Sequence, residues 1–185
     1  ADLVVNELYR DERPNAVCGP RWAVLRPEFV GLPSRVGRTP TGKVLVLFGG
    51  DDHAKLEPWA RNALQQRGAH VTSVGDYGSV AEAMVDADVL ITSCGRTVNE
   101  AASVGVPTVA IAANHRETSH VHVDGVIYGG LHATVAAMNL GRMVDRLLDH
   151  PELCDELSER MRSQVDGLGA QRIARRIDDL LSGVL

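Results

Sequence analysis

The chain has 185 residues, a formal net charge of -5, and 44% hydrophobic residues of which few are aromatic. This length supports one well-buried domain without disulfides or metals, and the composition excludes fibrous, disordered and disulfide-rich classes. Because acidic and basic residues are interleaved and form no basic stripe, nucleic acid is excluded as the expected partner.

No apolar run approaches the roughly 20 residues that a membrane-spanning helix needs, so we expect no membrane span. The three cysteines, Cys18, Cys94 and Cys154, are widely spaced and form no CxxC pair, which predicts reduced thiols and a cytoplasmic protein. The chain opens without Met on the strand-like residues 3–8, and we therefore expect a fragment or a processed chain.

Residues 1–41 and 42–185 form two regions of different character. The first holds a short β-like run, a polar loop and a stretch with no helical period. Residues 30–42 are rich in Gly, Pro, Arg, Ser and Thr, which indicates an extended linker because proline lacks a backbone donor and disfavours helix before it. We expect a boundary near residue 40.

Beyond this boundary, short apolar strands alternate with amphipathic helices. The pattern predicts strands at 43–48, 70–74, 88–92 and 108–112 and helices at 54–67, 79–87 and 97–104, with Gly68 and Gly105 ending two of the helices. This alternation predicts a doubly wound α/β fold with a parallel, Rossmann-like sheet. Three apolar stripes after residue 131 predict C-terminal helices that pack on the sheet or back across a partner lobe.

Ligands of such sheets bind beyond the carboxyl ends of the strands, where three loops are expected to meet. The first loop, Gly49 to His53, begins with two glycines whose backbone N–H groups could approach a phosphate. By itself the loop is better interpreted as a plain tight turn, because it has neither GxGxxG nor a Walker lysine, and Asp51 and Asp52 oppose an anion.

The second loop, Ser93 to Thr97, leads into a predicted helix. Gly95 permits close approach of a ligand, and Glu100 lies one turn into the helix, where a carboxylate could accept hydrogen bonds from a ribose diol. The spacing of Thr97 and Glu100 also fits a capping box, and spacing alone favours that interpretation.

The third loop contains Asn114, His115 and Arg116, followed by His120 and His122. The histidine spacing matches no common zinc pattern, so we expect no metal site. The alternatives are a solvated loop or a loop in which Asn114, His115 and Arg116 face a donor sugar.

Four segments in order resemble one known family: GPRWAVLRPEF at 19–29, VLVLFGGDD at 44–52, ADVLITSCGRTVNEAASVGVPTVAI at 87–111 and DGLGAQRI at 166–173. They are similar to the C-terminal half of glycosyltransferase B-type proteins, in particular the UDP-sugar hydrolases of pseudaminic acid biosynthesis and the spore-coat polysaccharide G-type proteins. The resemblance covers nearly the whole chain, and residues 1–41 would then be the end of the N-terminal lobe and the linker.

The resemblance implies that Gly49, Gly50 and Asp51 meet a diphosphate beside Gly95, Arg96 and Thr97, and that Glu100 binds the ribose of UDP. It therefore reverses the preference for a capping role of Glu100. In that family the N-terminal lobe supplies a catalytic histidine, so no catalytic residue is assigned here. Asp51, Arg96 and His115 depart from the family pattern, which leaves the sugar and the acceptor open.

We therefore expect the donor-binding half of a nucleotide-sugar hydrolase or glycosyltransferase, with UDP or a UDP-sugar as ligand, an N-terminal lobe or partner subunit, and no cofactor. Water or a hydroxyl would attack the anomeric carbon, with UDP as leaving group. The alternative is a non-catalytic donor-binding subunit that docks on a separate lobe. An NAD-binding domain has the right strand pattern but lacks the glycine fingerprint.

Overall fold

The computed structural model describes residues 2–49, 55–120 and 123–183. Within these residues, five strands form one sheet in the order β4-β3-β5-β6-β7, and every neighbouring pair is parallel. The strands are β3 (Lys43–Leu47), β4 (His70–Thr72), β5 (Val89–Ser93), β6 (Thr108–Ala112) and β7 (Ile127–Leu131). The predicted doubly wound α/β fold is therefore confirmed.

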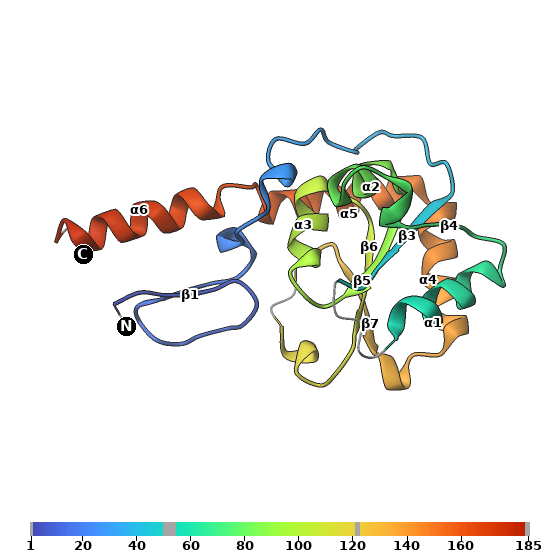
Figure 1. The fold of residues 1–185 in the computed structure, drawn as a ribbon, viewed down its shortest axis with the longest axis horizontal. Coiled ribbons are helices and arrows are strands. Elements are labelled where there is room, and N and C mark those ends of the chain that lie inside the picture. The colour runs from blue at the N-terminus through green and yellow to red at the C-terminus, as the bar shows by residue number, and fades with distance from the viewer. Residues whose placement is uncertain (1, 50–54, 121–122, 184–185) are drawn as a thin grey trace.

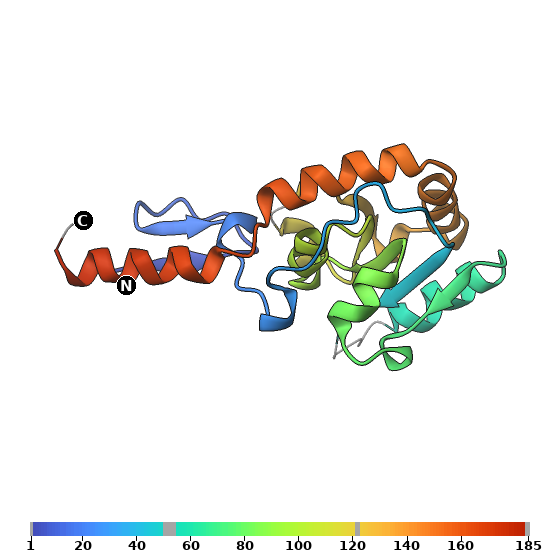
Figure 2. The same ribbon diagram turned by 90° about the horizontal axis from the view of Figure 1, so that it is seen from above.

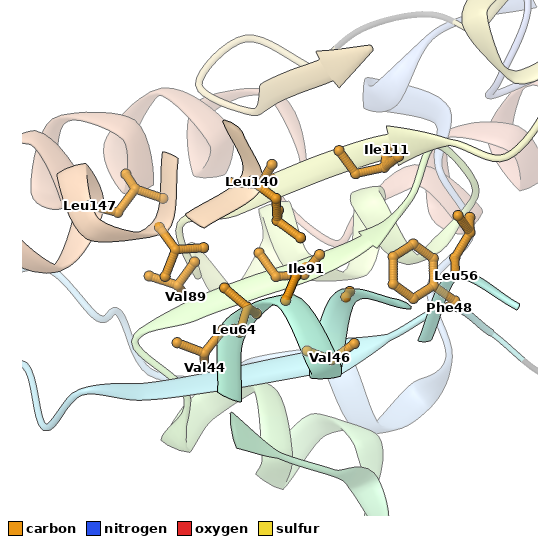
Figure 3. Packing of buried hydrophobic residues seen from close by; sticks show 14 of the residues in the cluster. Val44, Val46, Phe48, Leu56, Leu64, Val89, Ile91, Ile111, Leu140 and Leu147 are labelled. Atoms are coloured by element: carbon orange, nitrogen blue, oxygen red, sulfur yellow. The ribbon is translucent and has the colours of Figure 1, made fainter. Parts of the chain in front are cut away.

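Helices cover both faces of this sheet (Figure 1). They are α1 (Leu56–Gln65), α2 (Val80–Asp86), α3 (Thr97–Val104), α4 (Ala137–Asp149) and α5 (Pro151–Gln164). One cluster joins alternate strand residues such as Val46 and Ile91 to α1 and α4, as Figure 3 shows. The residues between them, such as Leu45 and Leu90, pack against α2 and α3 on the other face. Burial on both faces explains why these strands are continuous apolar runs in the sequence.

Glycine ends two of the predicted helices as expected. Gly68 and Gly105 follow α1 and α3 with φ of 77° and 78°, the left-handed conformation that side chains with a Cβ disfavour. The three predicted C-terminal helices are also present, the last being α6 (Gly169–Leu181). Of the described helices, none is long and apolar enough to cross a membrane.

Strand β7 has no counterpart in the sequence-based prediction. Its sequence, IYGGL, carries two glycines and forms an edge strand whose pairing with β6 is shifted between Ala110 and Ile111. A Cβ on Gly129 would lie 2.3 Å from Cδ1 of Ile111, so a larger residue at this position would require the Ile111 side chain to move. A glycine inside a strand can indicate such a close approach, but two in five residues hide the strand pattern.

Residues 2–29 form a small unit beside the sheet, and its Ala23 and Phe29 are buried in two of the apolar clusters of the sheet and its helices. Its strands β1 (Val4–Asn6) and β2 (Ala16–Cys18) pair in parallel, and two short 3-10 helices follow at Pro20–Trp22 and Pro27–Phe29. Helix α6 runs alongside this unit and away from the sheet in both Figure 1 and Figure 2. A Cβ on Gly169 would lie 2.1 Å from the carbonyl oxygen of Ala23, which shows how closely α6 begins against this unit.

Residues 30–42 contain no regular element and are fixed to the amino end of β5 by Asp88. The buried Asp88 carboxylate accepts hydrogen bonds from the Thr41 and Lys43 amides at 2.6 and 3.0 Å and from Arg35 at 3.3 Å. Burial raises the pKa of Asp88, but the amide hydrogen bonds lower it by more than burial raises it. The pKa of Asp88 therefore lies below its usual range. The linker is thus fixed by a buried polar cluster.

Candidate functional site

The strand order places a topological switch between β3 and β5, because α1 and α2 cross on opposite faces of the sheet. Ligands of open α/β sheets bind at such a switch, outside the carboxyl ends of the strands. The loop after β3 begins at Phe48 and Gly49, and Gly49 has φ of 73° with open space around a Cβ position. Gly50, Asp51, Asp52 and His53 lie outside the described residues.

The loop after β5 leads directly into α3, and it does not form the capping box that Thr97 and Glu100 suggest. Arg96 is the N-cap residue, Thr97 is already the first helical residue, and no side chain caps the helix. Within the described part of the chain, the backbone N–H groups of Gly95, Arg96 and Thr97 have no acceptor. Unpaired N–H groups at a helix start favour an anionic ligand.

Glu100 binds the side chain of Arg26 instead of the helix backbone. Nε and Nη2 of Arg26 donate to the two carboxylate oxygens of Glu100 at 2.7 and 3.0 Å. The guanidinium of Arg26 also lies 5.0 Å from the ring centre of Phe29, and Glu100 raises the pKa of Arg26 by accepting these hydrogen bonds. Each oxygen of Glu100 keeps a second lone pair, so further hydrogen bonds to a ligand remain available.

A cleft of about 710 Å³ lies between the carboxyl edge of the sheet and the N-terminal unit. Three predicted site residues, Arg96, Asn114 and Arg116, line it together. The other described site residues, Gly49, Gly95, Thr97, Glu100 and His115, are not part of its lining; His115 is exposed. The remaining lining residues are Val5, Asn6, Glu7, Leu8, Tyr9, Trp22, Val24, Glu117 and His120.

Glu7 joins the two walls of this cleft. Its Oε1 lies 2.7 Å from Nε of Arg96, and its Oε2 accepts a hydrogen bond from the amide of Val24 at 3.0 Å. The Arg96 side chain is 78% exposed, whereas that of Glu7 is 13% exposed. Arg96 is therefore held at one nitrogen and open to solvent on the rest of its guanidinium.

Sequence reasoning missed the polar cluster of Tyr9, Arg116 and His120 at the same cleft. The hydroxyl of Tyr9 lies 2.8 Å from Nε2 of His120 and accepts a hydrogen bond from Nε of Arg116 at 2.7 Å. The Tyr9 and His120 rings meet edge to face with centroids 4.7 Å apart. Tyr9 falls in a polar loop far from His120 in the sequence, and nothing in the spacing indicates that they meet.

Glu117 and Cys94 hold the loops after β5 and β6 together. The Oε2 of Glu117 accepts hydrogen bonds from the amides of Cys94 and Ala113 at 3.3 and 3.0 Å. Burial raises the pKa of the Cys94 thiol to about 12, so this cysteine is no thiolate nucleophile at neutral pH. All three cysteines are free thiols.

Among the residues that the structure describes, no three His, Cys, Asp or Glu side chains lie close enough together to hold a metal ion. His120 makes hydrogen bonds to Tyr9 and the Cys94 carbonyl, while His122 lies outside the described residues.

Comparisons with known proteins identify similar folds but no family. No family model matches the sequence, and no curated protein matches it. Among solved structures, MurG of Acinetobacter baumannii is similar, with a TM-score of 0.60 and 16% sequence identity. The match covers 95% of this chain and 60% of the MurG chain. A protein of Listeria monocytogenes named as a UDP-N-acetylglucosamine 2-epimerase matches 76% of this chain and 45% of its own, with a TM-score of 0.54 and 15% identity.

The chain spans about half the length of these two solved proteins. Both have the glycosyltransferase B architecture, and at this identity the likeness concerns the fold. The chain therefore shares the Rossmann-like α/β fold of glycosyltransferase B-type proteins.

Proposed function

We propose that this chain binds the UDP part of a nucleotide sugar, as the C-terminal half of a nucleotide-sugar hydrolase or glycosyltransferase. The observation that carries the proposal is the set of unpaired backbone N–H groups at the start of α3, which lie beside the Arg96 side chain and at the topological switch of the sheet. Such a site is complementary to a diphosphate because backbone dipoles, the helix N-terminus and a guanidinium all favour negative charge.

In this proposal the diphosphate binds at Gly95, Arg96 and Thr97 and is also approached by the loop that begins at Gly49. As the leaving group, it gains negative charge when water or a hydroxyl attacks the anomeric carbon, and these fixed dipoles stabilise that charge. The resemblance in sequence extends this site to Gly50 and Asp51.

Glu100 is the proposed ligand of the ribose hydroxyls. Its carboxylate is fixed by Arg26 and is 12% exposed, and an ordered acceptor loses little freedom when it binds a ligand. Asn114 and Arg116, which line the neighbouring cleft, are the proposed contacts of the sugar; His115 stays a sequence-based prediction.

The experiment is calorimetric titration of the purified chain with UDP, 2′-deoxy-UDP, UMP, CDP and NAD. The wild type should bind UDP most tightly. Glu100→Gln should lower the affinity for UDP by about 10- to 100-fold, because about 1.5–3 kcal/mol is typical of hydrogen bonds to a charged group. The variant should then bind UDP and 2′-deoxy-UDP with similar affinity.

Two control variants separate ribose binding from loss of the ion pair. Arg26→Gln breaks the same pair but keeps the Glu100 carboxylate, so UDP should remain preferred over 2′-deoxy-UDP. Glu159→Gln removes an exposed carboxylate from α5 and should change nothing. Tight NAD binding with no heat from UDP would reject the proposal.

A further inference from the structure

The cleft beside the proposed diphosphate site contains a hydrogen-bonded tyrosine and histidine that the nucleotide-binding role does not use. Tyr9 comes from the N-terminal unit, and Arg116 and His120 come from the loop after β6. We propose that Tyr9 and His120 act as one proton acceptor for the group that attacks the nucleotide sugar, in the place of the N-terminal-lobe histidine that the resemblance implies. This rests on the proposed function, because it requires a nucleotide sugar at the loop after β5.

Local hydrogen bonds fix the two side chains in place. Oδ1 of Asn6 accepts from the amide of Tyr9 at 3.0 Å, and this turn follows directly after β1. Oδ1 of Asn114 accepts from the amide of Glu117 at 3.1 Å, at the start of the 3-10 turn Glu117–Ser119 that leads to His120. Both walls therefore present their polar groups from hydrogen-bonded turns.

The hydrogen-bond partners determine where the protons lie. Nδ1 of His120 bonds to the carbonyl oxygen of Cys94, which can only accept, so Nδ1 carries the proton of the neutral ring. Nε2 is then an acceptor, and the hydroxyl of Tyr9 at 2.8 Å must donate to it. The oxygen of Tyr9 in turn accepts from Nε of Arg116.

This arrangement leaves the oxygen of Tyr9 with one lone pair for a ligand. The phenol has two acceptor positions, and Arg116 fills one of them. The Arg116 guanidinium, which also lies 5.6 Å from the Tyr9 ring centre, stabilises negative charge on the phenol oxygen as it develops.

The pair is linked to the proposed diphosphate site through a single residue. The carbonyl of Cys94 fixes His120, and the next amide along the chain, that of Gly95, is one of the unpaired N–H groups at the start of α3. Arg96 lines the same cleft as Tyr9 and His120. The proton acceptor and the leaving group would therefore be served by the same loop.

The reaction balances as follows. The attacking hydroxyl or water gives its proton to the oxygen of Tyr9 while Tyr9 gives its own proton to Nε2 of His120. The attacking oxygen forms a bond to the anomeric carbon, the bond from that carbon to the diphosphate oxygen breaks, and UDP leaves with the electron pair. His120 ends as an imidazolium whose Nδ1 still donates to Cys94.

The first test measures the proton positions without substrate, by nitrogen-15 NMR of the His120 ring at neutral pH. We expect protonated Nδ1 and unprotonated Nε2, with Tyr9→Phe changing the Nε2 resonance most. A neutral ring protonated on Nε2 overturns the proposal.

The second test follows UDP release from UDP-N-acetylglucosamine beside calorimetry with UDP. Tyr9→Phe and His120→Gln should each lower kcat by about 10²- to 10⁴-fold, the usual contribution of a general base, and leave KM and UDP affinity within about threefold. His70→Gln, at the opposite edge of the sheet, is the matched control and should keep wild-type turnover.

The outcomes separate the two proposals. A turnover that Tyr9→Phe and His120→Gln retain overturns the proton-acceptor role and leaves UDP binding intact. If the wild type binds the sugar nucleotide without cleaving it, turnover needs the other lobe, and the NMR result decides between the two assignments of the proton. A wild type without UDP affinity contradicts the proposed function, and the NMR result alone then decides whether Tyr9 and His120 share the proton as inferred.

Discussion

The sheet with its helices and the N-terminal unit with α6 differ in how much apolar surface they bury. The sheet buries three apolar clusters, and strands β5 and β6 consist almost wholly of buried residues. In α6 the only buried residue among those described is Gly169, while Ile177 and Leu181 are 44% and 83% exposed. The N-terminal unit meets the sheet and its helices through the buried apolar residues Ala23 and Phe29 and, beside the cleft, through the polar contacts of Glu7, Tyr9 and Arg26.

This difference explains where the cleft lies. Tight apolar packing leaves few gaps, whereas charged and polar side chains that span two units leave room for water and ligands between them. The cleft lies at this boundary, and its lining comes from both units. The hydrophobic part of the molecule is therefore the scaffold, and the polar boundary is where we place the chemistry.

The largest effect that tests this contrast is loss of a side chain from the centre of the sheet. Ile91 is fully buried in β5, and Ile91→Ala should lower the free energy of unfolding by about 2–5 kcal/mol because it leaves a cavity. Ile177→Ala in α6 makes the same chemical change at a half-exposed position and should cost less than about 0.5 kcal/mol. Urea unfolding measures both; similar losses would contradict the contrast.

The same contrast governs what could be predicted from sequence. Runs such as residues 43–47 and 108–112 are apolar because both faces of the strand are buried, so periodicity and glycine helix ends locate most of the sheet and its helices. Strand β7 is missed because two glycines, one of them packed against Ile111, stand where a strand pattern would have branched residues.

The site is only partly accessible to such reasoning. Loops at the carboxyl edge of a parallel sheet bring Arg96, Asn114 and Arg116 to one cleft, as topology predicts. The capping role of Glu100 is wrong because Arg26, 74 positions away, binds its carboxylate. Contacts of this kind depend on how two units meet, and no local pattern encodes them.

A smaller effect tests the polar anchor of the linker. Asp88→Asn should cost about 1–3 kcal/mol at neutral pH, because Arg35 and the Thr41 and Lys43 amides then face a neutral and poorer acceptor in a buried site. Urea unfolding of the variant and the wild type at pH 7 measures this difference.

The pH dependence of that difference has a definite sign. The pKa of Asp88 is lower in the folded chain than its ordinary value near 3.9, so its stabilisation is complete above that pH and is lost as the pH falls toward the folded pKa. The gap between wild type and Asp88→Asn should therefore narrow below about pH 4. A gap that stays constant to pH 3 would show that the Asp88 charge does not contribute.

The smallest effect concerns the start of α6, where Arg172 forms an ion pair within the C-terminal segment and a hydrogen bond to the N-terminal unit. Arg172 pairs with Asp166 and donates to the carbonyl of Arg21 at 3.0 Å, and the hydrogen bond from Arg172 lowers the pKa of Asp166 to about 2. Because Asp166 is 42% exposed, solvent screening limits the pair to less than about 1 kcal/mol.

Asp166→Asn should increase hydrogen exchange in α6 and leave exchange in β5 unchanged, whereas Asp179→Asn, on an exposed position of α6, should change neither. The wild-type advantage should disappear as the pH falls from about 4 to 2, since the folded pKa is the lower one. Faster exchange in β5 as well would mean that α6 and the sheet unfold as one unit, and the division into scaffold and polar boundary would then fail.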